Sequence, residues 1–247
     1  MIRRPPRSTL DRSSAASDVY KRQLSELAHV TITASGGPFR NRPHSSLENV
    51  TPEQALKHPT WSMGKRITID SALLMNKGFE VIESRWLFDI SWDKINVVLH
   101  PQSIVHSMVT FIDGSVKALL CPPNMRIPIQ YALSYPKRLP IISEKVTDPV
   151  DFGTLNFEPL DIENYPCFKL AIHAGKQGQT FPAVLTASDE VAVESFLQNR
   201  IKFTDIPKLL ETVLAEHTPT SAFSLQSILS ADQWARTRTE ELAKQLN

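Results

Sequence analysis

The sequence predicts an α/β (α+β) sheet domain followed by a small all-α helical bundle. Apolar runs of strand length at 95–100 and 104–111 predict neighbouring strands. Asp113-Gly114 follows the second run, and an Asp-Gly dipeptide favours a hairpin into a third strand. A helical apolar period follows Asp70, and every periodic segment in the last third of the chain is helical. Strands and helices therefore come first, and helices alone come last.

The composition excludes several classes of protein. Basic and acidic residues number 27 and 26, so the net charge of +1 leaves no basic footprint for a nucleic-acid partner. No apolar run approaches the roughly 18 residues of a membrane-spanning helix. Cys121 and Cys167 form no CxxC pattern, which argues against a disulfide scaffold or a structural zinc site and favours a reducing compartment. The 8 glycines are few for a whole nucleotide-binding enzyme.

Residues 1–23 differ from the rest of the chain. They contain six basic and two acidic residues and no apolar period, so we expect a non-native or disordered segment. The Arg- and Ser-rich composition is typical of a transit peptide, although Asp11 and Asp18 count against that interpretation. The segment also resembles translated sequencing-adaptor DNA. With either origin, we expect residues 1–23 not to form part of the folded domains.

The next segments predict one strand and one helix. The run 24–34 ends in alternating apolar residues and predicts a strand, which the Gly-Gly turn at 35–38 stops. Backbone N–H groups in such a turn can face an anion. Thr51 as N-cap and Pro52 at the first helical position predict a helix that ends at 58–59.

The clearest helical pattern runs from Asp70, as N-cap, to about Phe88. With about 100° per residue, one apolar stripe forms. It comprises Met75, Phe79, Ile82 and Trp86. Asn76, Lys77 and Glu80 fall together across the helix axis from that stripe. We expect the helix to cover the sheet.

The remainder divides into a strand, a linker and four helices. Residues 115–120 complete the hairpin, and the Pro-rich stretch 136–160 has no period, as expected of a linker. Helices are expected at about 165–175, 182–199, 205–217 and 230–245. The expected domains are 24–135 (catalytic sheet domain), 136–160 (linker) and 161–247 (helical domain).

Four groups of residues could carry chemistry, and each has an ordinary structural alternative. Ser35 with the two glycines could bind a phosphate or simply form a turn. The trio of Asn76, Lys77 and Glu80 could address one ligand, with Glu80 also suited to Mg²⁺ or Mn²⁺, or could form a salt-bridged helix face. The loop of His58 and Trp61 could be a flap over a ligand or a surface loop. The segment 100–107 could bring His and Ser side chains to a site, or its histidines could be hydrogen-bonded core residues.

Long motifs then give a specific resemblance. The segments TASGGPFR (33–40), HPTWSMGKRITIDSALLMNKGFEVIESRWLF (58–88), HPQSIVHSMV (100–109) and DGSVKALLCPPNMRIPIQYAL (113–133) resemble the 1-deoxy-D-xylulose 5-phosphate reductoisomerases. Weaker similarity extends to the end, so the resemblance covers 24–247. The family implies an NADPH-dependent oxidoreductase and isomerase of non-mevalonate isoprenoid biosynthesis, which makes 2-C-methyl-D-erythritol 4-phosphate.

The resemblance also implies roles for individual residues. Those implied to bind substrate are Ser35, His58, Trp61, Ser71, Asn76, Lys77, Ser103 and His106. Those implied to lie at the cofactor are Met63, Gly78, Ser103 and Met125. Glu80 is the implied metal ligand, and Glu80, His58 and Lys77 are the implied catalytic residues. The implied cofactors are NADPH and a divalent metal, Mg or Mn, and the implied assembly is a homodimer.

The chain departs from the family pattern in two respects. A Gly-rich NADPH loop and an Asp-x-Glu metal pair are absent from it, so we expect the catalytic and C-terminal part of the enzyme without its Rossmann-like NADPH domain, inactive alone. Ser188 and Asp189 also stand where Asn- and Ala-like residues are expected, which we interpret as a change in packing. The alternative function is a non-catalytic sugar-phosphate-binding or dimerisation module. The expected location is the bacterial cytoplasm, or the plastid stroma of a plastid-bearing eukaryote.

Overall fold

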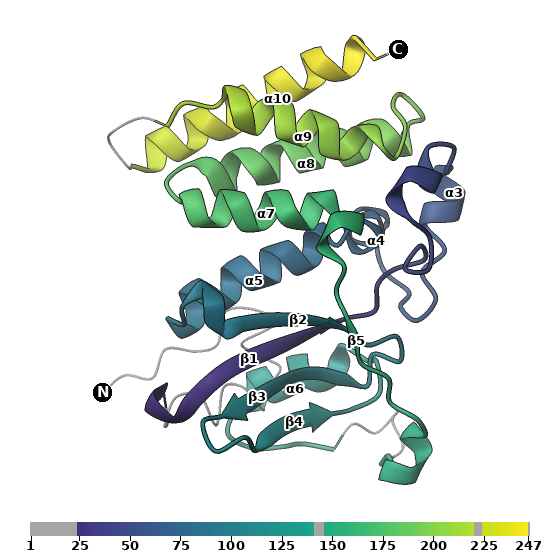
Figure 1. The fold of residues 1–247 in the computed structure, drawn as a ribbon, viewed down its shortest axis with the longest axis vertical. Helices are drawn as coiled ribbons and strands as arrows, with labels where there is room; N and C mark the ends of the chain where they lie inside the picture. The colour runs from purple at the N-terminus through teal and green to yellow at the C-terminus, as the bar shows by residue number, and fades with distance from the viewer. Residues whose placement is uncertain (1–23, 141–145, 220–223, 247) are drawn as a thin grey trace. The chain divides into compact units, whose positions relative to one another are not determined.

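A computed structural model describes residues 24–140, 146–219 and 224–246. The expectation about 1–23 lies outside these residues. The described chain packs as two compact units. The sheet unit comprises 24–35 and 83–160, and the helical unit comprises 36–82 and 161–246. Figure 1 follows the chain from β1 in purple to α10 in yellow.

The sheet unit is built on a mixed five-stranded sheet in the order β4-β3-β1-β2-β5. Its strands are β1 (Leu27–Ala34), β2 (Ile95–Leu99), β3 (Val105–Phe111), β4 (Val116–Leu120) and β5 (Glu158–Pro159). Central β1 runs parallel to β2, with Val30 opposite Ile95, and antiparallel to β3, with Val30 opposite Val109. Alternate residues of β3 are buried in its first five positions, whereas central β1 is buried continuously from Val30 to Ala34. The expected strands and the hairpin at Asp113-Gly114 are confirmed.

Two elements of the sheet unit were not expected. Helix α6 (Arg126–Ser134) follows a Pro-rich turn, and its Pro128 lies in the first turn, where a missing N–H costs little. Asn124 Oδ1 accepts a hydrogen bond from Arg126 N at 3.0 Å and so supports the start of the helix. Strand β5 lies within the expected linker 136–160 and pairs with β2 through Glu158 and Pro159. Part of the expected linker therefore forms the edge strand of the sheet next to β2.

The expected helix from Asp70 to Phe88 is wrong at its start. The chain forms α4 (Lys65–Ala72) and α5 (Met75–Phe88), which are separated at Leu74, where φ is +55°. Asp70 is a buried residue inside α4, not an N-cap. Trp86, placed on the apolar stripe, is 66% exposed.

The short helix before α4 is partly as expected. Thr51 and Gln54 form the capping box that starts α3 (Pro52–Ala55), which confirms the start of this helix. It ends before the expected 58–59. Single 3₁₀ turns occupy Leu24–Glu26, His44–Leu47, Trp92–Lys94, Pro149–Phe152 and Ile162–Asn164.

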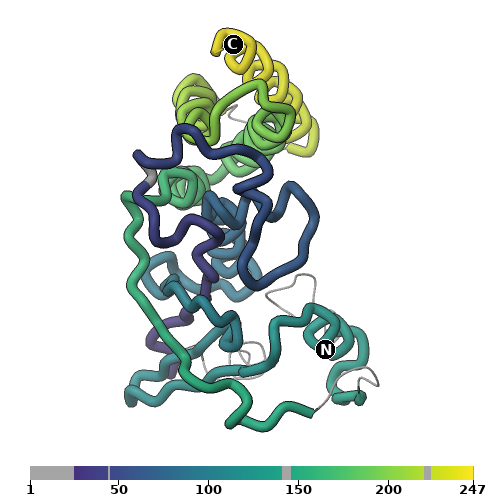
Figure 2. The backbone as a smooth tube through the Cα atoms, turned by 90° about the vertical axis from the view of Figure 1, so that its right-hand side faces the viewer, coloured from purple at the N-terminus to yellow at the C-terminus, as the bar shows by residue number. Residues whose placement is uncertain are grey.

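The helical unit contains α7 (Pro166–Gln177), α8 (Phe181–Leu197), α9 (Asp205–Glu216) and α10 (Leu225–Lys244). The four expected helices are confirmed, although α10 begins five residues early. Figures 1 and 2 show α8, α9 and α10 side by side, and their apolar faces form one core.

Residues 36–82 share this helical core, although we expected them with the sheet. Phe39 packs edge-on against Phe203 of the helical bundle with ring centroids 5.5 Å apart, and Ile69 and Met75 are fully buried in the same cluster. Burial of these apolar side chains against α7, α8 and α9 explains the difference. Among the described residues no helix combines the length and apolar character that crossing a membrane requires.

Candidate active site

The polar trio on α5 forms one connected group. Lys77 Nζ donates to Glu80 Oε2 at 2.6 Å, and Asn76 Nδ2 donates to Glu80 Oε1 at 2.9 Å. The Lys77 side chain is only 11% exposed and that of Glu80 24%. The helical period therefore placed the three correctly on one face. Because both oxygens of Glu80 accept hydrogen bonds from the other two, the group is internally neutralised.

The Gly-Gly turn lies against the end of α4. Gly37 has φ of +66°, and a Cβ there would lie 2.8 Å from Ala72 Cα and 3.0 Å from Ser71 O. Only glycine fits this close approach of two backbones. Gly37 of this turn thus lies next to the backbone of Ser71, one of the candidate phosphate-binding residues.

His58 organises the loop that we expected to act as a flap. Its Nδ1 accepts hydrogen bonds from the backbone N–H of Trp61 at 2.9 Å and of Thr60 at 3.1 Å. In the neutral ring the proton therefore sits on Nε2. Burial lowers the pKa of His58, which favours this neutral form. Trp61 and Met63 of the same loop are half-buried.

The remaining candidates belong to the sheet unit. Ser103 is buried with φ of +54°, His106 is half-buried on β3, and Met125 precedes α6 with its side chain 38% exposed. Half-buried His106 and buried Ser107 are neighbours on β3 and lie on opposite faces of the strand.

His100 has the structural role that we weighed for the histidines of this segment. Its Nε2 accepts hydrogen bonds from the N–H groups of Ile104 and Val105, both at 3.1 Å. Its Nδ1 lies 2.8 Å from Asn156 O, and its ring stacks on Phe157 at 4.7 Å. Both nitrogens are therefore committed to the backbone, which makes this residue a buried support of the sheet unit.

Gly78, one of the residues expected at the cofactor, lies in the contact between α5 and α7. A Cβ on Gly78 would lie 2.4 Å from Ala171 Cβ, so this glycine permits the close packing of α5 on α7. Its conformation is that of an ordinary helix, and the absent side chain faces the helical core. The glycine is thus required for packing, and its expected cofactor role stays a prediction.

One charged group was missed from the sequence. Asp70 on α4 and Asp189 on α8 are both buried, and Arg66 approaches each carboxylate at 3.7 Å. Arg66 and Asp70 are four residues apart on one helix, and this spacing could have predicted that their side chains interact. Asp189 on α8 was noted only as a departure from the family pattern, and nothing in the sequence linked it to Asp70, which lies more than a hundred residues earlier.

The described residues do not provide a complete metal site. Among them, no group of three or more His, Cys, Asp and Glu side chains lies close enough together to hold a metal ion. Glu80 is a single carboxylate, and its two oxygens already accept from Asn76 and Lys77. A divalent ion bound by oxygen ligands needs more ligands than this.

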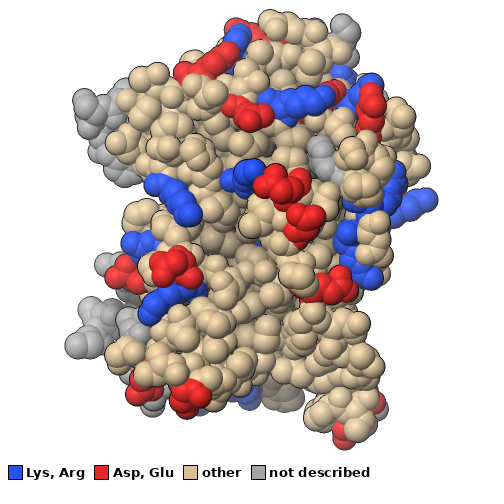
Figure 3. Space-filling view, in the orientation of Figure 1, with Lys and Arg blue, Asp and Glu red and all other residues tan. Residues whose placement is uncertain are grey.

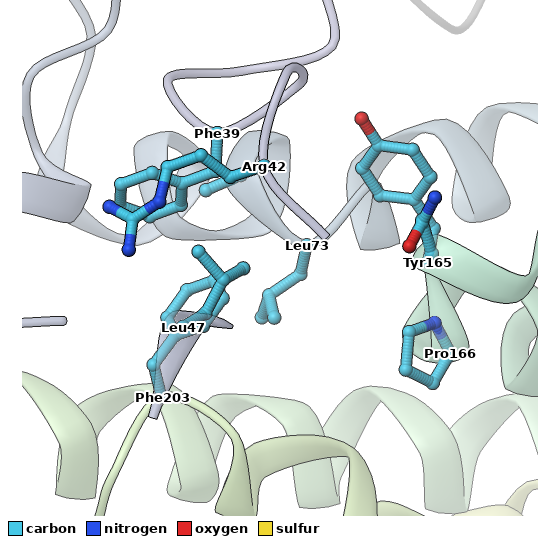
Figure 4. A pocket seen from close by; sticks show the side chains of 9 residues that line it. Phe39, Arg42, Leu47, Leu73, Tyr165, Pro166 and Phe203 are labelled. Carbon is cyan, nitrogen blue, oxygen red and sulfur yellow. The ribbon is translucent and has the colours of Figure 1, made fainter. Parts of the chain in front are cut away.

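A shallow recess in the helical unit lies apart from the candidate residues. It has room for about one water molecule and is lined by Phe39, Arg42, Leu47, Ala72, Leu73, Asn164, Tyr165, Pro166 and Phe203. Figure 4 shows mostly apolar side chains pointing into it. Its volume of about 10 Å³ is far below that of ordinary small-molecule pockets, roughly 300–1,000 Å³. Figure 3 shows basic and acidic residues interspersed over the face in view.

Comparison with known proteins identifies the family. Profiles described as the DXP reductoisomerase C-terminal domain and the 1-deoxy-D-xylulose 5-phosphate reductoisomerase C-terminal domain match residues 120–238 and 11–88. The second match begins inside the segment 1–23, whose origin stays a prediction. The reductoisomerase of Moorella thermoacetica is 49% identical over 99% of this chain, and that of Caldanaerobacter subterraneus subsp. tengcongensis is 54% identical over 86%.

Solved structures agree with the sequence comparison. The Zymomonas mobilis enzyme in complex with NADPH is 38% identical, with a TM-score of 0.87 over 97% of this chain. A DOX-P reductoisomerase in complex with NADPH, fosmidomycin and magnesium is 33% identical, with a TM-score of 0.87 over 96%. The chain spans 56–64% of the length of these four relatives. The profiles, the sequence identities and the fold together show that the chain belongs to the 1-deoxy-D-xylulose 5-phosphate reductoisomerase family.

Proposed function

We propose that this chain supplies the substrate phosphate-binding region and the flap of an NADPH- and metal-dependent reductoisomerase. The reaction converts 1-deoxy-D-xylulose 5-phosphate to 2-C-methyl-D-erythritol 4-phosphate. The observation that carries the proposal is the trio on α5, in which a nearly buried ammonium group is held beside an amide and a carboxylate. Such a group in a member of this family is best explained by an anionic ligand.

The residues can bind a phosphate through direct contacts. Lys77 supplies the charge and Asn76 an N–H donor, while Ser71 and Ser35 supply hydroxyl groups at the Gly-Gly turn. A phosphate that takes the donors of Lys77 and Asn76 releases Glu80 from both of its hydrogen bonds. Phosphate contacts distant from the reacting carbons hold the substrate in place and contribute binding free energy to catalysis.

Further substrate and cofactor roles are proposed for residues of the flap and, separately, of the sheet unit. His58 offers its Nε2–H to the phosphate, and Trp61 and Met63 close over the ligand and exclude water. In the sheet unit, Ser103 and His106 contact the substrate, and Ser103 and Met125 approach the cofactor. Glu80, His58 and Lys77 are the proposed catalytic residues.

The described residues do not fit complete sites for the metal or for NADPH. They supply one carboxylate for the metal, and the sequence has no G-x-G-x-x-G loop for a dinucleotide. We therefore propose that the 247-residue chain alone binds the sugar phosphate without turning it over. A homodimer and a cytoplasmic or plastid location remain parts of the same proposal.

Titration calorimetry with 1-deoxy-D-xylulose 5-phosphate tests the binding role. Lys77→Ala removes a charged hydrogen-bond donor that is worth about 1.5–3 kcal/mol, so the affinity should fall about tenfold to a hundredfold. Lys176→Ala, on an exposed position of α7, is the matched control and should leave the affinity unchanged. Equal affinities of the wild type and Lys77→Ala would refute the phosphate site.

A turnover assay tests the second part of the proposal. With substrate, NADPH and Mg²⁺ present, the chain should not oxidise NADPH. Turnover at an ordinary enzyme rate, on the order of 1–10³ s⁻¹, would contradict the proposed inactivity. Binding without turnover supports the proposal, whereas the absence of both would leave dimerisation, measurable by light scattering, as the alternative role.

A further inference from the structure

Two carboxyl groups lie buried together where α8 packs on α4. Asp189 is fully buried and Asp70 is 6% exposed. As ionised groups, both oxygens of Asp189 and Oδ1 of Asp70 have no hydrogen-bond donor. Each carboxyl group lies within hydrogen-bonding reach of the other. A carboxylate only accepts hydrogen bonds, so two ionised partners leave buried acceptors unsatisfied and like charges in contact.

The surrounding charges do not neutralise this pair. Arg66 lies 3.7 Å from Oδ2 of each aspartate, which is too long for a hydrogen bond. Its nearest partner is Glu190, which also pairs with Arg236, and Arg236 in turn pairs with Asp232. The guanidinium groups of Arg66 and Arg236 thus lie beside four carboxyl groups in total. From α7, the buried thiol of Cys167 faces the same pair, and burial raises the pKa of that thiol.

A proton resolves both difficulties. Protonated Asp189 becomes a donor to the Asp70 carboxylate, and the single remaining charge faces Arg66. We infer that Asp70 and Asp189 share one proton at neutral pH, and that this shared proton fixes α4 on the helical bundle at the residue before Ser71. Asp189 is thus a positioning residue for α4. The inference rests on the proposed function only in giving Ser71 a role.

The direction of the pH dependence follows from burial. Burial raises the pKa of Asp70 to about 6 and raises that of Asp189 well above its ordinary range. The folded chain therefore holds protons that the unfolded chain has already released, and its stability falls as the pH rises. Above the folded-state pKa values the two charges repel and favour separation of α8 from α4.

Asp189→Asn tests the inference, because an amide donates to Asp70 at every pH. Chemical unfolding of the full chain gives the unfolding equilibrium constant of each variant. The unfolding equilibrium constant of the wild type, divided by that of Asp189→Asn, should rise from about pH 5 to about pH 8. For one proton this rise is at most tenfold per pH unit. Glu211→Gln, on an exposed position of α9, is the control whose ratio should stay flat.

Infrared spectroscopy of the wild type detects the proton directly. A protonated carboxylic acid has a C=O stretch that carboxylates lack, and this band should be present at pH 7, remain in Glu211→Gln and disappear in Asp189→Asn. A missing band in the wild type would overturn the shared proton, and a flat stability ratio would overturn its role in fixing α4. Asp70→Asn should also remove the band if Asp189→Asn does not fold. Neither measurement involves a phosphate ligand, so either proposal can fail alone.

Discussion

Adding one methyl group at Gly78 tests the close contact between α5 and α7. The new Cβ would lie 2.4 Å from Ala171 Cβ, whereas carbon atoms pack at about 3.5–4.0 Å. The helices must therefore separate by about 1 Å or more. Alanine gains about 1 kcal/mol over glycine in a helix interior, but overpacking costs about 1–3 kcal/mol. Because the required shift is large, the upper half of that range applies, and Gly78→Ala should destabilise the chain by about 1–2 kcal/mol.

Urea unfolding measures this loss, and a second substitution checks its cause. Gly78→Ala combined with Ala171→Gly moves the methyl group to the other helix, so the double-mutant cycle should give a favourable coupling of about 2–3 kcal/mol. Gly64→Ala has nothing within 4 Å of the new Cβ and is the control without a steric clash; its expected cost of about 0.5–1 kcal/mol comes from the preference for glycine over alanine at the N-cap of α4. A Gly78→Ala variant more stable than the wild type by about 1 kcal/mol, as at an open helical position, would refute the reasoning.

Two predictions concern histidines whose pKa burial lowers. Because His58 Nδ1 accepts from the backbone N–H of Thr60 and Trp61, both amide NMR signals should titrate together, with a midpoint below that of an ordinary histidine; independent midpoints would contradict this arrangement. His217 contributes stability that is present above its unfolded pKa and lost as the pH falls through the lower folded value. The urea concentration at the unfolding midpoint should therefore fall less on acidification in His217→Gln than in the wild type. His173→Gln, at an exposed position of α7, should behave as the wild type does.

Periodic features of the fold and the site could be predicted from the sequence. Alternation of apolar residues predicted β1, an apolar run of strand length predicted β3, and the helical repeat brought Asn76, Lys77 and Glu80 to one face. These predictions depend only on neighbours within one element, which is why local periodicity was sufficient.

The errors share a different cause. The break between α4 and α5 requires φ of +55° at Leu74. Leucine rarely adopts this left-handed conformation, so the sequence does not predict the break. The role of Gly78 depends on Ala171, and the environment of Asp70 depends on Asp189. Such contacts join distant parts of the chain, so a single sequence gives no signal for them.

The path of the chain between its two units has a consequence for protein synthesis. The chain changes unit after residues 35, 82 and 160, so neither unit is one continuous stretch. Phe39 needs Phe203, and Glu48 pairs with Lys202, so the helical core closes only after most of the chain has been made. Until then the apolar faces of residues 36–82 stay exposed, which is the condition that favours chaperone binding and aggregation. A fragment of residues 161–246 expressed without residues 36–82 would expose the apolar side chains that pack against residues 36–82 in the whole chain.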